Sequence, residues 1–251
     1  MKILKFGGTS VANPQNIRLV KNIVSKSKSD KTIVVVSALG GITDLLIKTA
    51  HLASNQDISY KTVLKEIEDR HFFTSKELIP IAAQSKVLSK VKSELNTLET
   101  LLEGAYLIGE ITPKLSDKIV SYGELLSSYI ISEYFIVEKL SCAYKDSREL
   151  IKTNDAFGKA VVNFAITNKN CSTYFETISD NIVVMAGFIA SSIQGNATTL
   201  GRGGSDYTAA IVASALNAEV LEIWTDVSGM YTANPKLVKQ AMAIPHISYE
   251  E

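Results

Sequence analysis

The chain has 251 residues, of which 46% are apolar and 21% charged, which is enough to bury the core of one large globular domain or two modest ones. Its 26 basic and 26 acidic residues give a formal net charge of zero, so composition gives no electrostatic support to a nucleic-acid partner. The sequence has no apolar run of about 18 residues and no secretory signal, so we expect no membrane-spanning helix and a cytoplasmic location.

The N-terminal third alternates strands, glycine turns and helices. Residues 3–6 predict a buried strand that ends at the glycine pair 7–8, and Asn13-Pro14 predicts the N-cap and first residue of a helix. The run TIVVV at residues 32–36 predicts a second strand that is buried on both faces. A further glycine pair then leads into a helix from about Thr43. This order is typical of βαβ units and predicts a parallel sheet.

The middle of the chain predicts helices, and strands return in the C-terminal third. Residues from about 59 to 138 are mainly helical in pattern, and one predicted helix runs from about Ser116 through Tyr134. The remaining predictions are strands at residues 142–144, 182–189 and 219–224, a hairpin turn at 194–196, and a glycine loop at 201–205 that leads into a helix over 206–216.

Four loops lie just after predicted strands and carry residues suited to an anionic ligand. In an open α/β sheet, ligands bind beyond the carboxyl ends of the strands, so we expect these loops to face one crevice. Glycine turns at helix starts present free N–H groups to an anion, and Lys5 lies just before the first turn. The sequence lacks GxxxxGK[ST], and GxGxxG near its first strand, so it supports neither a P-loop nor a Rossmann site. The four loops cover residues 7–10, 37–43, 201–206 and 225–226.

Most of these features also have a purely structural interpretation. A glycine pair after a strand, such as Gly7-Gly8, is as often a tight turn as a phosphate site. An acid after a strand, such as Asp226, is more often a cap or turn residue, and Glu124 in an apolar helical segment is compatible with a paired structural acid. Arg202 is harder to explain structurally, because a charge on a glycine loop stabilises no core and is well placed to bind an anion.

Seven segments form an ordered series over nearly the whole chain: KFGGTSV (5–11), VVVSALGGITDLL (34–46), SYGELLS (121–127), KTNDAFG (152–158), GFI (187–189), TTLGRGGSDYTAA (198–210) and IWTDVSGMYTANP (223–235). Together they resemble aspartokinases, and most closely the kinase part of bifunctional aspartokinase–homoserine dehydrogenases. The resemblance implies the amino-acid kinase fold, an α/β three-layer αβα sandwich with a largely parallel central sheet. It also implies one catalytic domain over residues 1–251, with an aspartate-binding lobe over about 1–190 and a nucleotide-binding lobe over 191–251.

The resemblance further implies a phosphotransferase that uses ATP and Mg²⁺ to convert L-aspartate into 4-phospho-L-aspartate, the first step toward lysine, threonine and methionine. It implies a homo-oligomer for the full-length protein. The implied residues are catalytic Lys5 and Asp206; aspartate-binding Ser37, Thr43, Glu124, Phe188, Arg202 and Ser205; and nucleotide-binding Lys5, Gly7, Gly8, Thr225, Asp226, Tyr231 and Lys236.

The chain departs from the aspartokinase pattern near its C-terminus. Lys236 stands where the family commonly has arginine, so it keeps the charge but loses the planar fork. Residues 248–251 predict the start of a helix, so we expect a truncated chain that stops before a nucleotide-contacting lysine and the regulatory ACT domains of the family. Two alternatives stay open: a kinase for glutamate, carbamate or a nucleoside monophosphate, and a fragment that binds aspartate without turnover.

Overall fold

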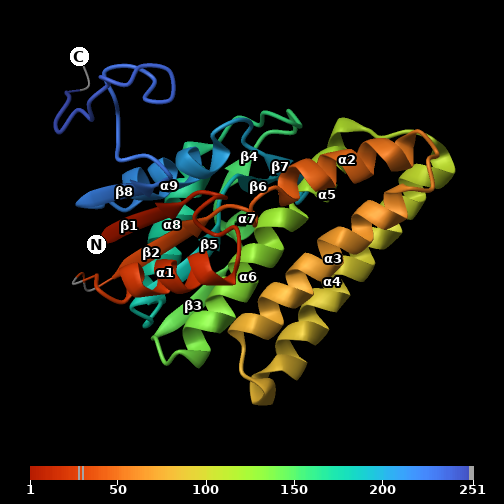
Figure 1. Ribbon diagram of the computed structural model, residues 1–251, viewed down its shortest axis with the longest axis horizontal. Helices are drawn as coiled ribbons and strands as arrows, with labels where there is room; N and C mark the ends of the chain where they lie inside the picture. Colours follow the sequence, from red (N-terminus) through yellow and green to blue (C-terminus); the bar gives the residue numbers. More distant parts are fainter. Residues whose placement is uncertain (28, 30, 249–251) are drawn as a thin grey trace.

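The computed structural model describes residues 1–27, 29 and 31–248, which fold around a five-stranded parallel sheet (Figure 1). β1 and β2 occupy its middle, so the turns that follow them lie side by side at one edge. Every residue of β2 is buried, as its unbroken apolar run predicts for a strand covered on both faces. The strand order is β3 (Cys142–Lys145), β5 (Ile182–Ala186), β2 (Thr32–Val36), β1 (Lys2–Phe6) and β8 (Val220–Trp224).

Helices cover both faces of the sheet and form the two outer layers. Side chains alternate along each strand, so Leu4 and Phe6 pack into one core while Ile3 packs into the other. The predicted three-layer αβα sandwich is therefore confirmed. One layer holds α1 (Pro14–Val24), α2 (Ile42–Ser54), α3 (Tyr60–Leu78), α4 (Ile81–Ile108), α5 (Pro113–Val120) and α6 (Tyr122–Val137), and the other holds α7 (Ser147–Leu150), α8 (Phe164–Thr177) and α9 (Gly204–Ala215).

Side-chain caps begin helices α1 and α5. The Asn13 side chain accepts a hydrogen bond from the Asn16 N–H, with proline as the first helical residue of α1. Thr112 caps α5 in the same way by accepting from the Leu115 N–H. Helices α3 and α4 run antiparallel as a long pair that extends away from the sheet (Figure 1).

A second, three-stranded sheet contains β4 (Lys152–Thr153), β6 (Ile189–Ser192) and β7 (Ala197–Thr199). The predicted turn at 194–196 is confirmed, because β6 and β7 pair antiparallel across it. The predicted single strand over 182–189 is wrong: it divides into β5 and β6, because Phe188 adopts a φ of 65° and turns the chain.

Two helical predictions also need correction. The single helix predicted from Ser116 through Tyr134 is two helices, α5 and α6, which meet at Ser121. Helix α8 was not predicted. Within the described residues, no helix combines the length and apolarity needed to cross a membrane. The predicted helix start at 248–251 lies outside the described residues except for Ser248.

Candidate active site

The turns after β1 and β2 and the loop before α9 enclose a cavity of about 340 Å³. The carboxyl ends of the central parallel strands β1 and β2 supply one part of its wall, and α6 and the loop before α9 supply the rest. The predicted shared crevice is therefore present for the first three loops. Nine of the predicted site residues line it: Lys5, Gly8, Ser37, Thr43, Glu124, Phe188, Arg202, Ser205 and Asp206.

The two predicted catalytic residues form an ion pair in this cavity. Lys5 Nζ lies 2.7 Å from Asp206 Oδ1, and Lys5 as a whole is only 8% exposed. A buried ammonium needs such a partner, because its desolvation is otherwise costly. Asp206 lies in the first turn of α9, where a carboxylate also interacts favourably with the helix dipole. The pair therefore holds the lysine ammonium beside the N-terminus of α9.

Glu124 contributes a buried carboxylate that is only partly satisfied. Its Oε1 accepts a hydrogen bond of 3.2 Å from the Ala38 N–H, and its Oε2 has no partner among the described residues. Burial raises the pKa of the Glu124 carboxyl to about 8, against the opposing effect of the Ala38 amide. An acceptor that is buried, unpaired and aimed at a cavity suits a ligand that brings a donor.

Close backbone packing fixes the serine hydroxyls at the base of the cavity. Ser37, directly after β2, donates from its Oγ to the Oγ of Ser205 on α9 at 3.0 Å. A Cβ on Gly187 would lie 2.6 Å from that of Ser205, and a Cβ on Gly204 would lie 2.7 Å from the Phe188 ring. Glycine is therefore required at both positions. Arg202 lies on the same loop and is exposed, so its guanidinium is accessible to a solute.

The predicted nucleotide contacts do not all converge. Thr225 and Asp226 line a second cavity, of about 270 Å³, on the other side of the first glycine turn. Gly7 lies between the two cavities, since a Cβ there would be 3.5 Å from Lys5 Nζ and 3.9 Å from the Trp224 carbonyl oxygen. Tyr231 and Lys236 line neither of these two cavities; they lie in the segment after β8.

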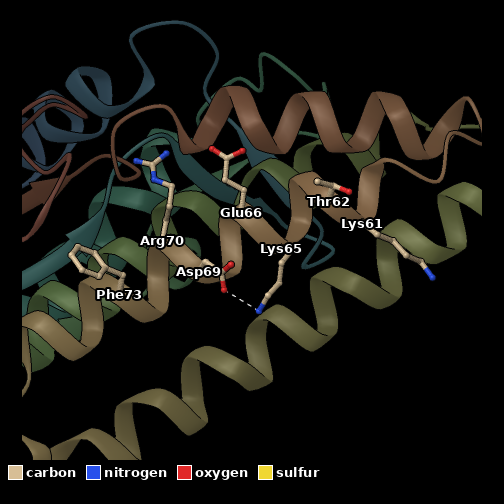
Figure 2. Close-up of a pocket in the computed structure, with 7 residues that line it drawn as sticks. All are labelled: Lys61, Thr62, Lys65, Glu66, Asp69, Arg70 and Phe73. Carbon is tan, nitrogen blue, oxygen red and sulfur yellow. Dashed lines mark ion pairs between the residues drawn. The ribbon is translucent and has the colours of Figure 1, made fainter.

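A wider hollow, of about 760 Å³, lies on the exposed surface of α3 and holds none of the predicted residues (Figure 2). Lys65 and Asp69 pair across one turn of this helix at 2.9 Å. Figure 2 shows Glu66 and Arg70 pointing from α3 toward α2. Arg70 Nη2 donates to the Gly40 carbonyl oxygen at 2.5 Å. This surface therefore supports the second glycine turn from outside. Its charged residues all come from the single helix α3, whereas the cavity of Lys5 is lined from several elements.

Sequence reasoning missed the groups that hold the site together. The Ala38 N–H bonds Glu124, Arg70 bonds Gly40, and Asp117 bonds the strand that leads to Arg202. Hydrogen bonds made by backbone groups do not depend on residue type, so the sequence gives no indication of them. Asp117 does leave a signal, because an acid at a core-facing helical position needs an explanation.

A dedicated metal centre is not built into the described part of the chain. No group of three or more histidine, cysteine, aspartate or glutamate side chains there could hold an ion. Mg²⁺ in nucleotide sites is bound mainly by phosphates and water with one or two carboxylates. Asp206, whose side chain is about half exposed, is the cavity carboxylate that fits this role.

Comparison with known proteins assigns the chain to a family. Residues 1–251 match the sequence profile of the amino acid kinase family. The chain belongs to this family. It is 34% identical over 248 residues to bifunctional aspartokinase/homoserine dehydrogenase 1, chloroplastic, of Arabidopsis thaliana, covering 98% of this chain and 27% of that protein. It is also 34% identical over 256 residues to lysine-sensitive aspartokinase 3 of Escherichia coli K12, covering 99% and 54%.

Solved structures of this family have the same fold. The crystal structure of E. coli aspartokinase III in complex with aspartate and ADP matches with a TM-score of 0.89 at 34% identity, over 97% of this chain and 53% of that one. A structure of isopentenyl phosphate kinase, at 16% identity and a TM-score of 0.54, shares the fold alone. The chain therefore spans between a quarter and about half of the length of the relatives described above.

Proposed function

We propose that the protein transfers the γ-phosphoryl group of ATP to the side-chain carboxylate of L-aspartate. The observation that carries the proposal is the cavity in which Lys5, Glu124 and Arg202 face the same space. Aspartate has two carboxylates and one ammonium, and phosphoryl transfer adds the charges of the nucleotide. Two cations and one partly satisfied carboxylate suit that set of charges. The similarity to an aspartokinase crystallised with aspartate and ADP supports the same substrate.

The proposed chemistry needs no catalytic base. The side-chain carboxyl of aspartate has an unperturbed pKa of about 3.9, so it is already ionised at neutral pH. Its oxygen forms a bond to the γ-phosphorus, the bond from that phosphorus to the bridging oxygen breaks, and ADP leaves with the electron pair. The obstacle is repulsion between two anions, so positioning and charge neutralisation supply the catalysis. Lys5 and the free amides at the start of α9 provide that neutralisation.

Substrate recognition is divided among the remaining cavity residues. Arg202 binds the α-carboxylate of aspartate through its planar fork, and Glu124 binds the ammonium. The hydroxyls of Ser37 and Ser205 and the side chains of Thr43 and Phe188 complete the pocket. Asp206 orients Lys5 through the ion pair described above and is not a base.

ATP binding uses the other side of the glycine turn. The aspartate lobe covers residues 1–190 and the nucleotide lobe 191–251, and Arg202 and Ser205 reach the aspartate from the nucleotide lobe. Gly7, Gly8, Thr225 and Asp226 adjoin the two cavities, and Tyr231 and Lys236 contribute from the segment beyond β8. Mg²⁺ enters with the phosphates of ATP and supplies positive charge to them. The full-length protein is a homo-oligomer in this proposal, and it serves the pathway to lysine, threonine and methionine.

Calorimetry followed by an ADP-release assay tests the proposal. We expect the chain to bind L-aspartate and a non-hydrolysable ATP analogue, and to release ADP faster with aspartate than with glutamate, carbamate or a nucleoside monophosphate. Arg202→Ala raises KM for aspartate and leaves KM for ATP unchanged, whereas Asp206→Ala lowers kcat. A preference for another acceptor contradicts the substrate assignment. Aspartate binding without nucleotide binding assigns the chain to a binding module instead.

A further inference from the structure

Asp117 is a buried carboxylate that the proposed chemistry does not use. It lies on α5, is 4% exposed, and lines neither the substrate cavity nor the neighbouring one. Its two oxygens accept from three donors. The Gly158 N–H lies 3.0 and 2.9 Å from the two oxygens, the Thr199 N–H lies 2.9 Å from Oδ2, and the Thr199 hydroxyl lies 2.9 Å from Oδ1. All contacts come from donors, which suits the acceptor-only chemistry of a carboxylate.

These donors belong to two segments that support the loop of Arg202. Thr199 ends β7, and the next residue, Leu200, donates from its N–H to the Phe188 carbonyl oxygen at 2.9 Å. The Gly158 carbonyl oxygen lies 3.4 Å from where a Cβ of Gly201 would be. The loop over 201–203 therefore begins from a strand end and a turn that Asp117 holds together.

On its other side, Asp117 is joined to the helix that carries Glu124. Its own carbonyl oxygen accepts from the Ser121 N–H at 3.0 Å, at the point where α5 ends and α6 begins. Glu124 follows within the first turn of α6. One residue therefore connects the element that supplies the buried carboxylate of the cavity to the loop that supplies its exposed guanidinium.

We infer that Asp117 is a positioning residue that sets the separation between Glu124 and Arg202 and thereby the affinity for the amino-acid substrate. The inference rests on the proposed function, because those two side chains bind the ammonium and the α-carboxylate of one small molecule. Hydrogen bonding is lost over a few tenths of an ångström, so a ligand held at both ends is sensitive to a shift of either element. Lys5 and Thr225, which serve the nucleotide, lie on β1 and directly after β8, outside the segments that Asp117 contacts.

Three variants test the inference in the intact chain, with titrations of L-aspartate and of a non-hydrolysable ATP analogue. Asp117→Ala removes every contact to the three donors, and we expect at least about tenfold weaker aspartate binding, equivalent to about 1.4 kcal/mol. Asp117→Asn keeps one acceptor oxygen and regains part of this loss, with binding weaker by about threefold. Binding of the ATP analogue stays unchanged in both. Asp155→Ala is the matched control, because Asp155 accepts from Asn196 in the same region but is exposed.

The results separate a failure of the inference about Asp117 from a failure of the proposed function. Equal aspartate affinity in wild type and both Asp117 variants overturns the inference and leaves the proposed function intact. Equal weakening of aspartate and nucleotide analogue also overturns it, because that indicates a general loss of structure. If Asp117→Ala does not fold, as judged by its urea transition, Asp117→Asn decides alone by the same criteria. A wild-type chain that binds no aspartate overturns the proposed function, and the inference with it.

Discussion

The half-satisfied carboxylate of Glu124 predicts that aspartate binding depends on pH. Burial holds the pKa of this carboxyl at about 8, so near pH 7 it is mostly protonated. The substrate ammonium pairs with the ionised form, so each binding event below pH 8 displaces a proton. The charged groups that share the cavity are Lys5, Arg202 and Asp206, and the first and last of these already pair with each other. Aspartate affinity therefore rises with pH.

The magnitude follows from the protonated fraction. For a group of pKa about 8, the apparent dissociation constant for aspartate falls by roughly 25-fold between about pH 6.5 and about pH 8.5. Calorimetry across this range measures the affinity, and titration in two buffers of different ionisation enthalpy measures the released proton. Glu124→Gln binds aspartate weakly and without this pH dependence. Glu133→Gln is the matched control, because Glu133 is buried on the same helix but pairs with Lys86.

The Glu124 carboxyl also makes stability depend on pH, but stability falls as pH rises whereas aspartate affinity increases. Its pKa is raised on folding, so its contribution favours the folded state below about pH 4.5 and is lost as pH rises through about 8. Over that range the loss has an upper limit of about 5 kcal/mol, from about 1.4 kcal/mol per pKa unit. Glu124→Gln is thus more stable than wild type at pH 8.5 in urea unfolding. An aspartate affinity that is independent of pH in wild type refutes the reasoning, as does a slope that Glu124→Gln retains.

Two other predictions concern the scaffold. Burial lowers the pKa of His71 to about 4, so its neutral form stabilises the fold above about pH 6.5. About 3 kcal/mol of this stability is lost as pH falls toward 4. In urea unfolding, His71→Gln is therefore less sensitive to acid than wild type, while the same change at the exposed His51 has no effect. Gly187→Ala forces a Cβ against Ser205, so it lowers the free energy of unfolding by about 1–3 kcal/mol and weakens aspartate binding. Gly104→Ala, where a Cβ meets nothing within 4 Å, is expected to stabilise α4, and destabilisation there would contradict the packing argument.

The main sheet could be predicted because its strands carry a strong local signal. A continuous apolar run such as residues 32–36 has few alternatives to a buried parallel strand, and glycine pairs mark where such strands end. Since parallel strands end at one edge, the shared cavity of Lys5 and Ser37 follows from order along the chain. Arg202 follows β7 of the second sheet, so this rule does not explain its position. The assignment of individual roles came from the resemblance, because the physics of these residues alone indicates only an anionic ligand.

The errors lie where tertiary contacts override local pattern. Phe188 continues an apolar run in sequence, yet it turns the chain because its N–H bonds Thr208 on α9. The division of α5 from α6 falls at Ser121, and the nearby Gly123 lies within α6 and does not mark the break. Helix α8 buries only Thr167, Cys171 and Phe175, a stripe too sparse to stand out against its polar residues.

Two buried carboxylates on adjacent helices show why hydrogen-bond partners distinguish structure from function. Asp117 and Glu124 are both acids in apolar surroundings, exposed by 4% and 3%. Asp117 accepts from three donors that the chain itself supplies, so it stabilises the fold it belongs to. Glu124 accepts from one, and the remaining oxygen lowers stability until a ligand donates to it. No residue-type pattern separates the two, since the difference depends on donors from residues 38, 158 and 199. A substrate ammonium is the donor that completes the hydrogen bonds accepted by Glu124, which is why aspartate binding and loss of a proton are coupled at this residue.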